Sequence, residues 1–252
     1  LPIVNFGFLR NYNWFELGII DINLAGKGNE LFGFYRNNLG RHSGQIYFKW
    51  NQIRNSSFSI AFDGISWQSL EPLNIEDFRL DYDYRNQLFG TTIFYRYSPN
   101  LEYFLGGNIF TEQYLKLPTD LIDSPGPEAL NLTKQLVKLG LNYQRVKFKS
   151  FNLDGFRLEN EFQYVYTEET SERFYLHRSA ISYFKIINSK LNLASRLSSG
   201  FSTNNDSPFS PFLIDSYQNI RGIGNRLFRG TGIISSNLET RINIYNGNSW
   251  AF

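Results

Sequence analysis

Strict two-residue alternation between apolar and polar side chains constrains this chain more than any other feature. In residues 77–85 every second side chain is apolar and those between are charged: Phe78, Leu80, Tyr82 and Tyr84 against Arg79, Asp81, Asp83 and Arg85. Successive side chains of a strand point to opposite faces, whereas a helix gathers residues three and four apart on one face. This segment therefore predicts a strand with one apolar and one charged face.

The same alternation recurs in residues 45–51, 137–143 and 156–164. The apolar sets are Ile46, Phe48 and Trp50; Val137, Leu139, Leu141 and Tyr143; and Phe156, Leu158, Phe162 and Tyr164. The opposite sets are Gln45, Tyr47, Lys49 and Asn51; Lys138, Gly140 and Asn142; and Arg157, Glu159, Glu161 and Gln163. The acid pairs at 81/83 and 159/161 alternate with arginines, so we interpret them as salt-bridge ladders facing a water-filled interior rather than as catalytic carboxylates.

The predicted strands follow one another with short, turn-rich connections, which is typical of a meander of hairpins. They span residues 2–9, 14–24, 29–37, 42–51, 57–68, 76–86, 88–98, 101–112, 133–147, 153–167, 172–187, 190–201 and 230–245, with a further start near Asn248. The connections 114–132 and 202–229 are longer, and long loops often carry function. A chain that enters a membrane from the periplasm needs an odd number of strands before an extracellular loop. The twelve strands predicted before residue 202 are an even number, which indicates that one predicted strand boundary between residues 57 and 98 is wrong.

The strand lengths favour a transmembrane barrel. Most predicted strands reach the ~9 to 11 residues that a tilted strand needs to cross a bilayer, whereas strands of soluble domains average about 5 to 6. No run approaches the ~18 to 20 apolar residues of a membrane-spanning helix. The fold class predicted is all-β, an antiparallel up-and-down β-barrel with its apolar face in lipid and Tyr and Trp near the strand ends. The alternative is a soluble lipocalin-like or jelly-roll protein with a core of aromatic side chains; dependence on detergent separates the two.

The composition offers little for enzyme chemistry. The chain has no cysteine, two histidines inside predicted strands (His42 and His177) and a net charge of +2. We therefore expect no catalytic, metal or cofactor site and no nucleic-acid partner. The glycine-rich residues 219–226 superficially resemble a phosphate-binding loop, but they do not follow a strand and open a helix as such a loop does.

The same glycine-rich stretch supports a different hypothesis. Residues Ile220-Arg221-Gly222-Ile223-Gly224 lie at the end of the longest loop. In the strand that follows, alternation places Asn237, Glu239 and Arg241 on the polar face. If the loop folds back into the lumen, Arg221 can form a charge-assisted pair with the Glu239 carboxylate.

Residues 220–223 resemble the Val-Arg-Gly-Phe/Tyr signature of the BamA superfamily of outer-membrane assembly and secretion barrels, with Ile223 in place of the aromatic residue. Residues 23–28 (Asn-Leu-Ala-Gly-Lys-Gly) are similar to that family's Asn-Leu-x-Gly-x-Gly hairpin turn. The resemblance implies a 16-stranded barrel, of which about 12 to 14 strands are visible in this chain. It also implies that the signature lies at the tip of a loop inside the lumen, where Arg221 meets Glu239.

The resemblance implies a bacterial outer-membrane protein, not an enzyme, that assists the insertion or translocation of other polypeptides. The implied partners are outer-membrane lipids, an unfolded or exported polypeptide and accessory lipoproteins. We expect residues 1–252 to form one barrel domain, with further strands after Phe252 and no periplasmic modules before Leu1. The alternatives are a dedicated two-partner secretion transporter, the membrane anchor of a larger surface protein, and a passive diffusion pore.

Overall fold

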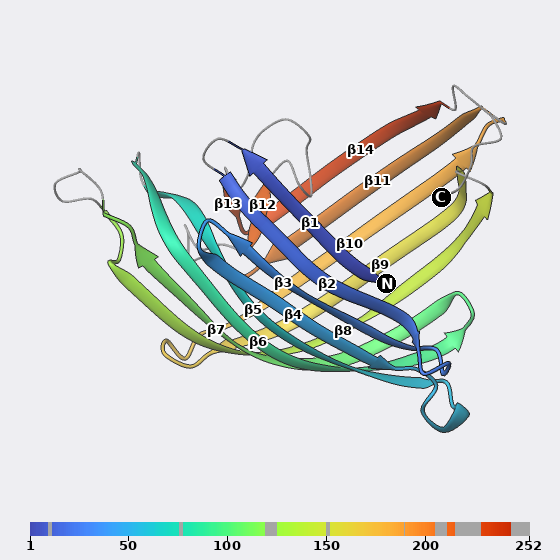
Figure 1. The fold of residues 1–252 in the computed structure, drawn as a ribbon, viewed down its shortest axis with the longest axis horizontal. Coiled ribbons are helices and arrows are strands. Elements are labelled where there is room, and N and C mark those ends of the chain that lie inside the picture. The colour runs from blue at the N-terminus through green and yellow to red at the C-terminus, as the bar shows by residue number, and fades with distance from the viewer. Residues whose placement is uncertain are drawn as a thin grey trace.

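The computed structural model describes residues 1–9, 12–75, 78–118, 125–149, 152–188, 190–204, 211–214 and 228–242. Its main sheet has twelve antiparallel strands that pair in chain order (Figure 1). They are β1 (Pro2–Leu9), β2 (Tyr12–Leu24), β3 (Asn29–Asn38), β4 (Arg41–Trp50), β5 (Phe58–Ile75), β6 (Phe78–Ser98), β7 (Leu101–Lys116), β8 (Ala129–Lys149), β9 (Asn152–Thr167), β10 (Arg173–Ile186), β11 (Leu191–Ser202) and β14 (Gly232–Ile242). Within these described ranges, β1 and β14 are the two edges of the sheet and do not pair with each other.

Two short elements complete the fold. A second sheet pairs β12 (Phe212–Ile214) with β13 (Phe228–Gly230), and a 3-10 turn, η1 (Ile53–Asn55), joins β4 to β5. Among the described residues the main sheet alone has twelve strands, within the predicted range of about 12 to 14 barrel strands. No helix in the described part of the chain is long and apolar enough to cross a membrane.

Eleven strands precede the long connection that follows Ser202, so the odd number that the topology requires is present. The predicted strands 76–86 and 88–98 are one strand, β6, and this was the wrong boundary. β6 pairs with β5 without a register shift from Phe58↔Tyr95 to Ile75↔Phe78. The polar residues Asn86 and Gln87 interrupt the apolar pattern but not the pairing, because backbone hydrogen bonds do not depend on side-chain type.

Connections lie at both ends of the strands, and the two longest lie at the same end. Those at one end of the strands, which we name the turn end, include residues 25–28, 99–100 and 187–190. Those at the other end, the loop end, include residues 117–128 and the long connection between β11 and β14. Transmembrane barrels have short periplasmic turns and longer extracellular loops, and the two longest connections follow that pattern.

The outer face of the sheet exposes large apolar side chains, and we name this set the apolar belt. It includes Val4, Phe6, Phe15, Leu17, Ile19, Ile46, Trp50, Phe58, Phe62, Phe89, Ile93, Tyr95, Leu105, Ile109, Val137, Leu139, Tyr175, Ile181, Tyr183, Leu197, Phe201, Ile234, Leu238 and Ile242. Ile234 and Leu238 are 80% and 78% exposed. A soluble sandwich would bury these side chains, whereas contiguous exposed apolar surface is typical of contact with lipid or a partner.

The predicted faces are confirmed on β4, β8, β9 and β14 but are wrong at the start of β6. On β6, Asp81, Asp83 and Arg85 lie on the same face as the exposed Phe89, which is the outer face. Leu80 and Tyr82 point inward and are 1% and 0% exposed. The salt bridges of Asp81 and Asp83 therefore lie on the outer face of the sheet, and not in the interior as predicted. The reason is strand length: β6 has 21 residues, about twice what a bilayer needs, and beyond the belt the outer side chains meet water.

Candidate functional site

The hairpin formed by β12 and β13 lies against the inner, polar face of the main sheet. Phe212 of β12 is 7% exposed and packs over Gly200 of β11. A Cβ atom at position 200 would overlap the Phe212 ring, so the close approach requires glycine. The guanidinium carbon of Arg178, on β10, lies 5.7 Å from the centre of the same ring. These contacts fix one side of the hairpin to β10 and β11.

The other side of the hairpin is held by an ion pair to β5, which we name the Arg229–Glu71 lock. Nη2 of Arg229 donates to Oε2 of Glu71 at 2.8 Å, and the Ser69 hydroxyl donates to Oε1 at 2.9 Å. The side chains of Arg229 and Glu71 are 14% and 4% exposed. Because the pair is charge-assisted and largely removed from water, it is a stronger contact than a surface salt bridge.

The two attachments show how strongly the sheet is curved. Glu71 on β5 and Gly200 on β11 are six strand positions apart, which is about 29 Å along a sheet with ~4.8 Å between strands. The hairpin spans this separation with a few residues, since Gly230 pairs with Phe212 and directly follows Arg229. The inner face must therefore be concave, as the bent sheet in Figure 1 shows. The hairpin crosses the space that this curved sheet encloses.

An aromatic cluster on the inner face supports the lock. Its buried members come from β5, β6 and β7: Leu73, Leu80, Tyr82 and Tyr114. The Arg229 guanidinium also hydrogen-bonds the Tyr114 side chain. These apolar residues limit the access of water to the ion pair and so strengthen it.

A second segment, residues 125–128, covers the same cluster. The Tyr82 hydroxyl donates to the Pro127 carbonyl at 3.0 Å, and the Lys116 amide donates to the Glu128 carbonyl at 2.9 Å. Gly126 has a φ of +89°, and a Cβ there would collide with Ile75 and the Tyr82 hydroxyl. Two segments that are distant in sequence, this one and the hairpin, thus cover the inner face near the loop end.

The predicted partners on β14 lie on the inner face, as expected. Nη2 of Arg241 donates to Oε2 of Glu239 at 3.0 Å, and Asn237 is opposite Arg196 of β11. Arg221, Gly222, Ile223 and Gly224 lie outside the described residues. The contact between Arg221 and Glu239 therefore stays a prediction.

The other predicted ladder is confirmed on the inner face of β9. Glu159 pairs with Arg157 on its own strand, and Nη2 of Arg196 on β11 lies 3.9 Å from Oε2 of Glu159. Farther toward the loop end, the Glu112 carboxylate accepts from Lys134 at 2.5 Å and from the Tyr84 hydroxyl at 2.9 Å. The inner face is therefore lined by paired charges, as a water-filled lumen would favour.

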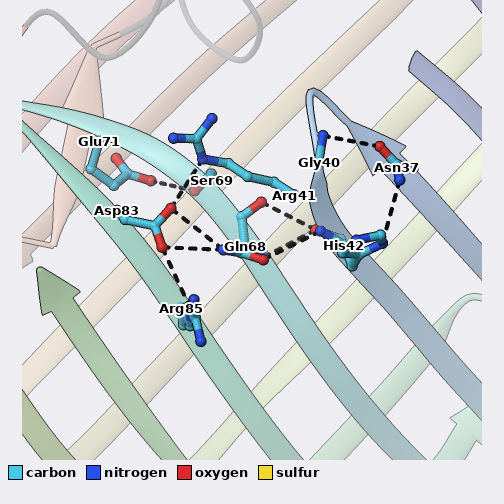
Figure 2. A network of polar contacts seen from close by, with 10 residues as sticks. Asn37, Gly40, Arg41, His42, Gln68, Ser69, Glu71, Asp83 and Arg85 are labelled. Atoms are coloured by element: carbon cyan, nitrogen blue, oxygen red, sulfur yellow. Dashed lines mark hydrogen bonds and ion pairs between the residues drawn. The ribbon is translucent and has the colours of Figure 1, made fainter. Parts of the chain in front are cut away.

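Figure 2 shows the polar contacts between β4, β5 and β6 beside Glu71. On the outer side, Asp83 accepts from Nε of Arg41 at 3.0 Å and from Nε2 of Gln68 at 3.1 Å, and it lies 3.5 Å from Nε of Arg85. The next residue along β5, Ser69, points inward and donates to Glu71. The outer network is half-exposed and has its own partners, so it does not contribute charge to the lumen.

The two histidines take no part in the lock. His177 is on the outer face of β10, where Nδ2 of Asn160 lies 2.9 Å from its Nε2. Nδ1 of His42, on β4, lies 2.6 Å from the Tyr35 hydroxyl. Among the described residues, no group of three or more histidines and carboxylates could hold a metal ion.

Comparison with solved structures supports the barrel fold. The chain is similar to a crystal structure of BamA from Haemophilus ducreyi that lacks POTRA domains 1–3, with a TM-score of 0.68 and 11% sequence identity. The match covers 98% of this chain and 59% of that one, so this chain spans little more than half of the BamA structure. At this identity the similarity shows the fold: an antiparallel up-and-down sheet of the outer-membrane β-barrel type.

An anion-selective porin from Comamonas acidovorans aligns over 91% of this chain and 59% of its own, with 10% identity. Its TM-score of 0.39 is too low to indicate a shared fold. No protein-family model matches the sequence, and no curated protein matches it.

Proposed function

We propose that this chain is the membrane-embedded part of an outer-membrane barrel that assists the insertion or translocation of other polypeptides, with the hairpin of β12 and β13 as an internal plug. The single observation that carries the proposal is the hairpin that crosses the concave face, attached to β11 through Phe212 and to β5 through the Arg229–Glu71 lock. A plug of this kind regulates a lumen, and it suits a barrel that handles polypeptides better than one with free diffusion.

Three further observations support the proposal. The apolar belt exposes side chains that need lipid around them. The inner face carries paired charges such as Glu159 with Arg157. The fold matches BamA over nearly the whole chain. The partners we propose are outer-membrane lipids, an unfolded or exported polypeptide and accessory lipoproteins, and the chain would act without catalysing a covalent reaction.

The test is a folding assay with the full-length protein reconstituted in lipid vesicles. A urea-unfolded eight-stranded outer-membrane barrel is added as the probe, and its folding is followed by protease resistance. We expect faster folding than in vesicles that hold an unrelated barrel protein, and slower folding when Arg229 is replaced by alanine. Equal rates in both kinds of vesicle would contradict the proposal.

Conductance measurements distinguish the proposed function from the alternative of a passive diffusion pore. In a planar bilayer we expect low conductance from the wild type and higher conductance from Arg229→Ala, because the variant releases the hairpin. A steady open conductance that is unchanged by Arg229→Ala would favour a diffusion pore.

A further inference from the structure

A group of polar side chains interrupts the centre of the apolar belt on β9, β10 and β11. It consists of Asn160, His177, Ser179 and Ser199, which we name the belt patch. Asn160 is directly opposite Ser179, and Ser179 is directly opposite Ser199. His177 is two residues from Ser179 on the same face, and its ring contacts the Asn160 amide. All four side chains point away from the lumen, on the face that carries Ile181 and Phe201.

The belt patch lies midway between two aromatic rims. Along β10 the outer side chains run Tyr175, His177, Ser179, Ile181 and Tyr183, so Ser179 is four residues from each tyrosine. Tyrosine collects at the two interfaces of a membrane. Eight residue steps cover about 26 Å along a strand, which at a tilt of ~40° is about 20 Å of height, most of the ~25 Å apolar band of a barrel. The patch is therefore at the middle of the proposed hydrocarbon layer.

Polar groups at this depth need hydrogen-bond partners, because lipid chains offer none. Asn160 and His177 satisfy each other with one hydrogen bond, which leaves the amide oxygen and the second ring nitrogen available. The hydroxyls of Ser179 and Ser199 have no hydrogen-bond partner among the described residues. A partner that supplies both donors and acceptors within the membrane would satisfy all four groups.

We propose that the belt patch is the contact surface for a second copy of this chain, arranged about a two-fold axis along the membrane normal. A second copy in the same membrane carries the same groups at the same depth and in the same orientation. Each residue of the patch has both a donor and an acceptor when histidine is neutral, so the patch is complementary to itself. The serines are small and allow two sheets to approach closely, as small residues do between membrane helices. This inference rests on the membrane location given under the proposed function.

The absence of cysteine from the sequence allows a direct test by disulfide cross-linking. Ser179→Cys and Ser199→Cys are made in the full-length protein, reconstituted in vesicles at high lipid-to-protein ratio and oxidised. The matched control is Thr91→Cys, a polar outer-face position within the belt on β6. We expect a cross-linked dimer for at least one serine position, about tenfold more than for the control, since a disulfide needs Cα atoms within ~7 Å. Cross-linking equal to that of Thr91→Cys at both positions would overturn the proposal.

A second measurement tests whether the polar groups drive association. The dissociation constant of the dimer is measured in vesicles by energy transfer between labelled copies. For Asn160→Leu with His177→Leu we expect it to rise about tenfold, the effect of losing about two hydrogen bonds at their strength in membranes. Thr91→Val should leave it unchanged. A dimer as tight in the double variant as in the wild type would exclude the belt patch as the contact.

The outcomes for the dimer and for the membrane location are distinguishable. A chain that stays monodisperse in plain buffer contradicts the proposed function and this inference together. A chain that requires detergent but gives no cross-link above the control contradicts the dimer alone.

Discussion

Replacing Arg229 by alanine should release the hairpin from the inner face of the sheet. The Glu71 side chain is only 4% exposed, so the variant removes the Arg229 guanidinium from a buried carboxylate. Removing one member of a buried ion pair costs about 3 to 5 kcal/mol. Because ~1.4 kcal/mol corresponds to a factor of ten, the population with the hairpin undocked should rise at least about 100-fold.

Limited proteolysis of the full-length protein in vesicles measures this population. With a protease of broad specificity, cleavage between residues 203 and 231 follows the open fraction when reclosing is fast compared with cleavage. The matched control is Arg85→Ala, because Arg85 also pairs with a carboxylate, that of Asp83, but is 60% exposed on the outer face. A surface pair contributes about 0 to 1 kcal/mol, so its cleavage rate should change less than about fivefold.

The double variant Glu71→Ala with Arg229→Ala isolates the pair itself. It removes the buried Glu71 carboxylate as well, and it should therefore be less open than the sum of the two single variants implies, with a coupling energy of about 2 kcal/mol. A rate for Arg229→Ala within fivefold of the wild type would refute the reasoning. Additive effects of the two single changes would do the same.

Three other substitutions test separate features. Gly200→Ala should displace Phe212 and destabilise docking by about 1 to 3 kcal/mol, measured by the same proteolysis. Leu139→Arg puts a charge in the apolar belt and should lower the free energy of unfolding in vesicles, measured with urea, by about 2 to 4 kcal/mol. The Glu169 carboxylate accepts a hydrogen bond from the Thr133 amide, and this contact lowers the pKa of Glu169 from its ordinary value of 4.5. The hydrogen bond is therefore present above pH 4.5 and is lost as the pH falls through the lowered pKa of the folded protein. The Thr133 amide chemical shift should titrate below pH 4.5, and Glu169→Gln should abolish the titration.

Each of the three has a matched control. Gly107→Ala adds a Cβ at ordinary contact distance from the Leu136 carbonyl and should leave docking unchanged. Asn142→Arg places the charge on the inner face opposite Glu159, where it should be tolerated. Glu168→Gln removes a neighbouring carboxylate and should leave the titration of the Thr133 amide in place. A large effect of any control would contradict the corresponding argument.

Alternation in the sequence was sufficient to predict the strands and most of their faces. It succeeded on β4 and β9 because lipid-facing and lumen-facing residues must differ in polarity wherever a strand crosses the belt. It failed on β6 because period two assigns residues to two sets but does not say which set points inward. Near Tyr82 the inner face is covered by residues 125–128. A sheet face that is covered by protein is as apolar as a sheet face in contact with lipid.

The candidate site could be predicted only in part. The polar face of β14 with Glu239 follows from local alternation, whereas the lock joins residues 158 positions apart. No local pattern specifies such a pairing. One signal was present: Glu71 is an acid on the face of β5 that also carries Leu73, and a carboxylate among apolar neighbours needs a cationic partner. The sequence alone cannot say that the partner is Arg229.

The point at which β6 changes polarity locates the lock relative to the membrane. On its outer face the last strongly exposed apolar side chain is Phe89, and Gln87 and Arg85 follow it toward the loop end. Glu71 is opposite Tyr82, five residues beyond Gln87, which is about 16 Å along the strand. The lock therefore lies above the hydrocarbon layer, where the desolvation of an ion pair is less costly than among lipid chains. The plug would accordingly close the lumen from its extracellular end and leave the membrane-spanning part of the inner face open toward the turn end.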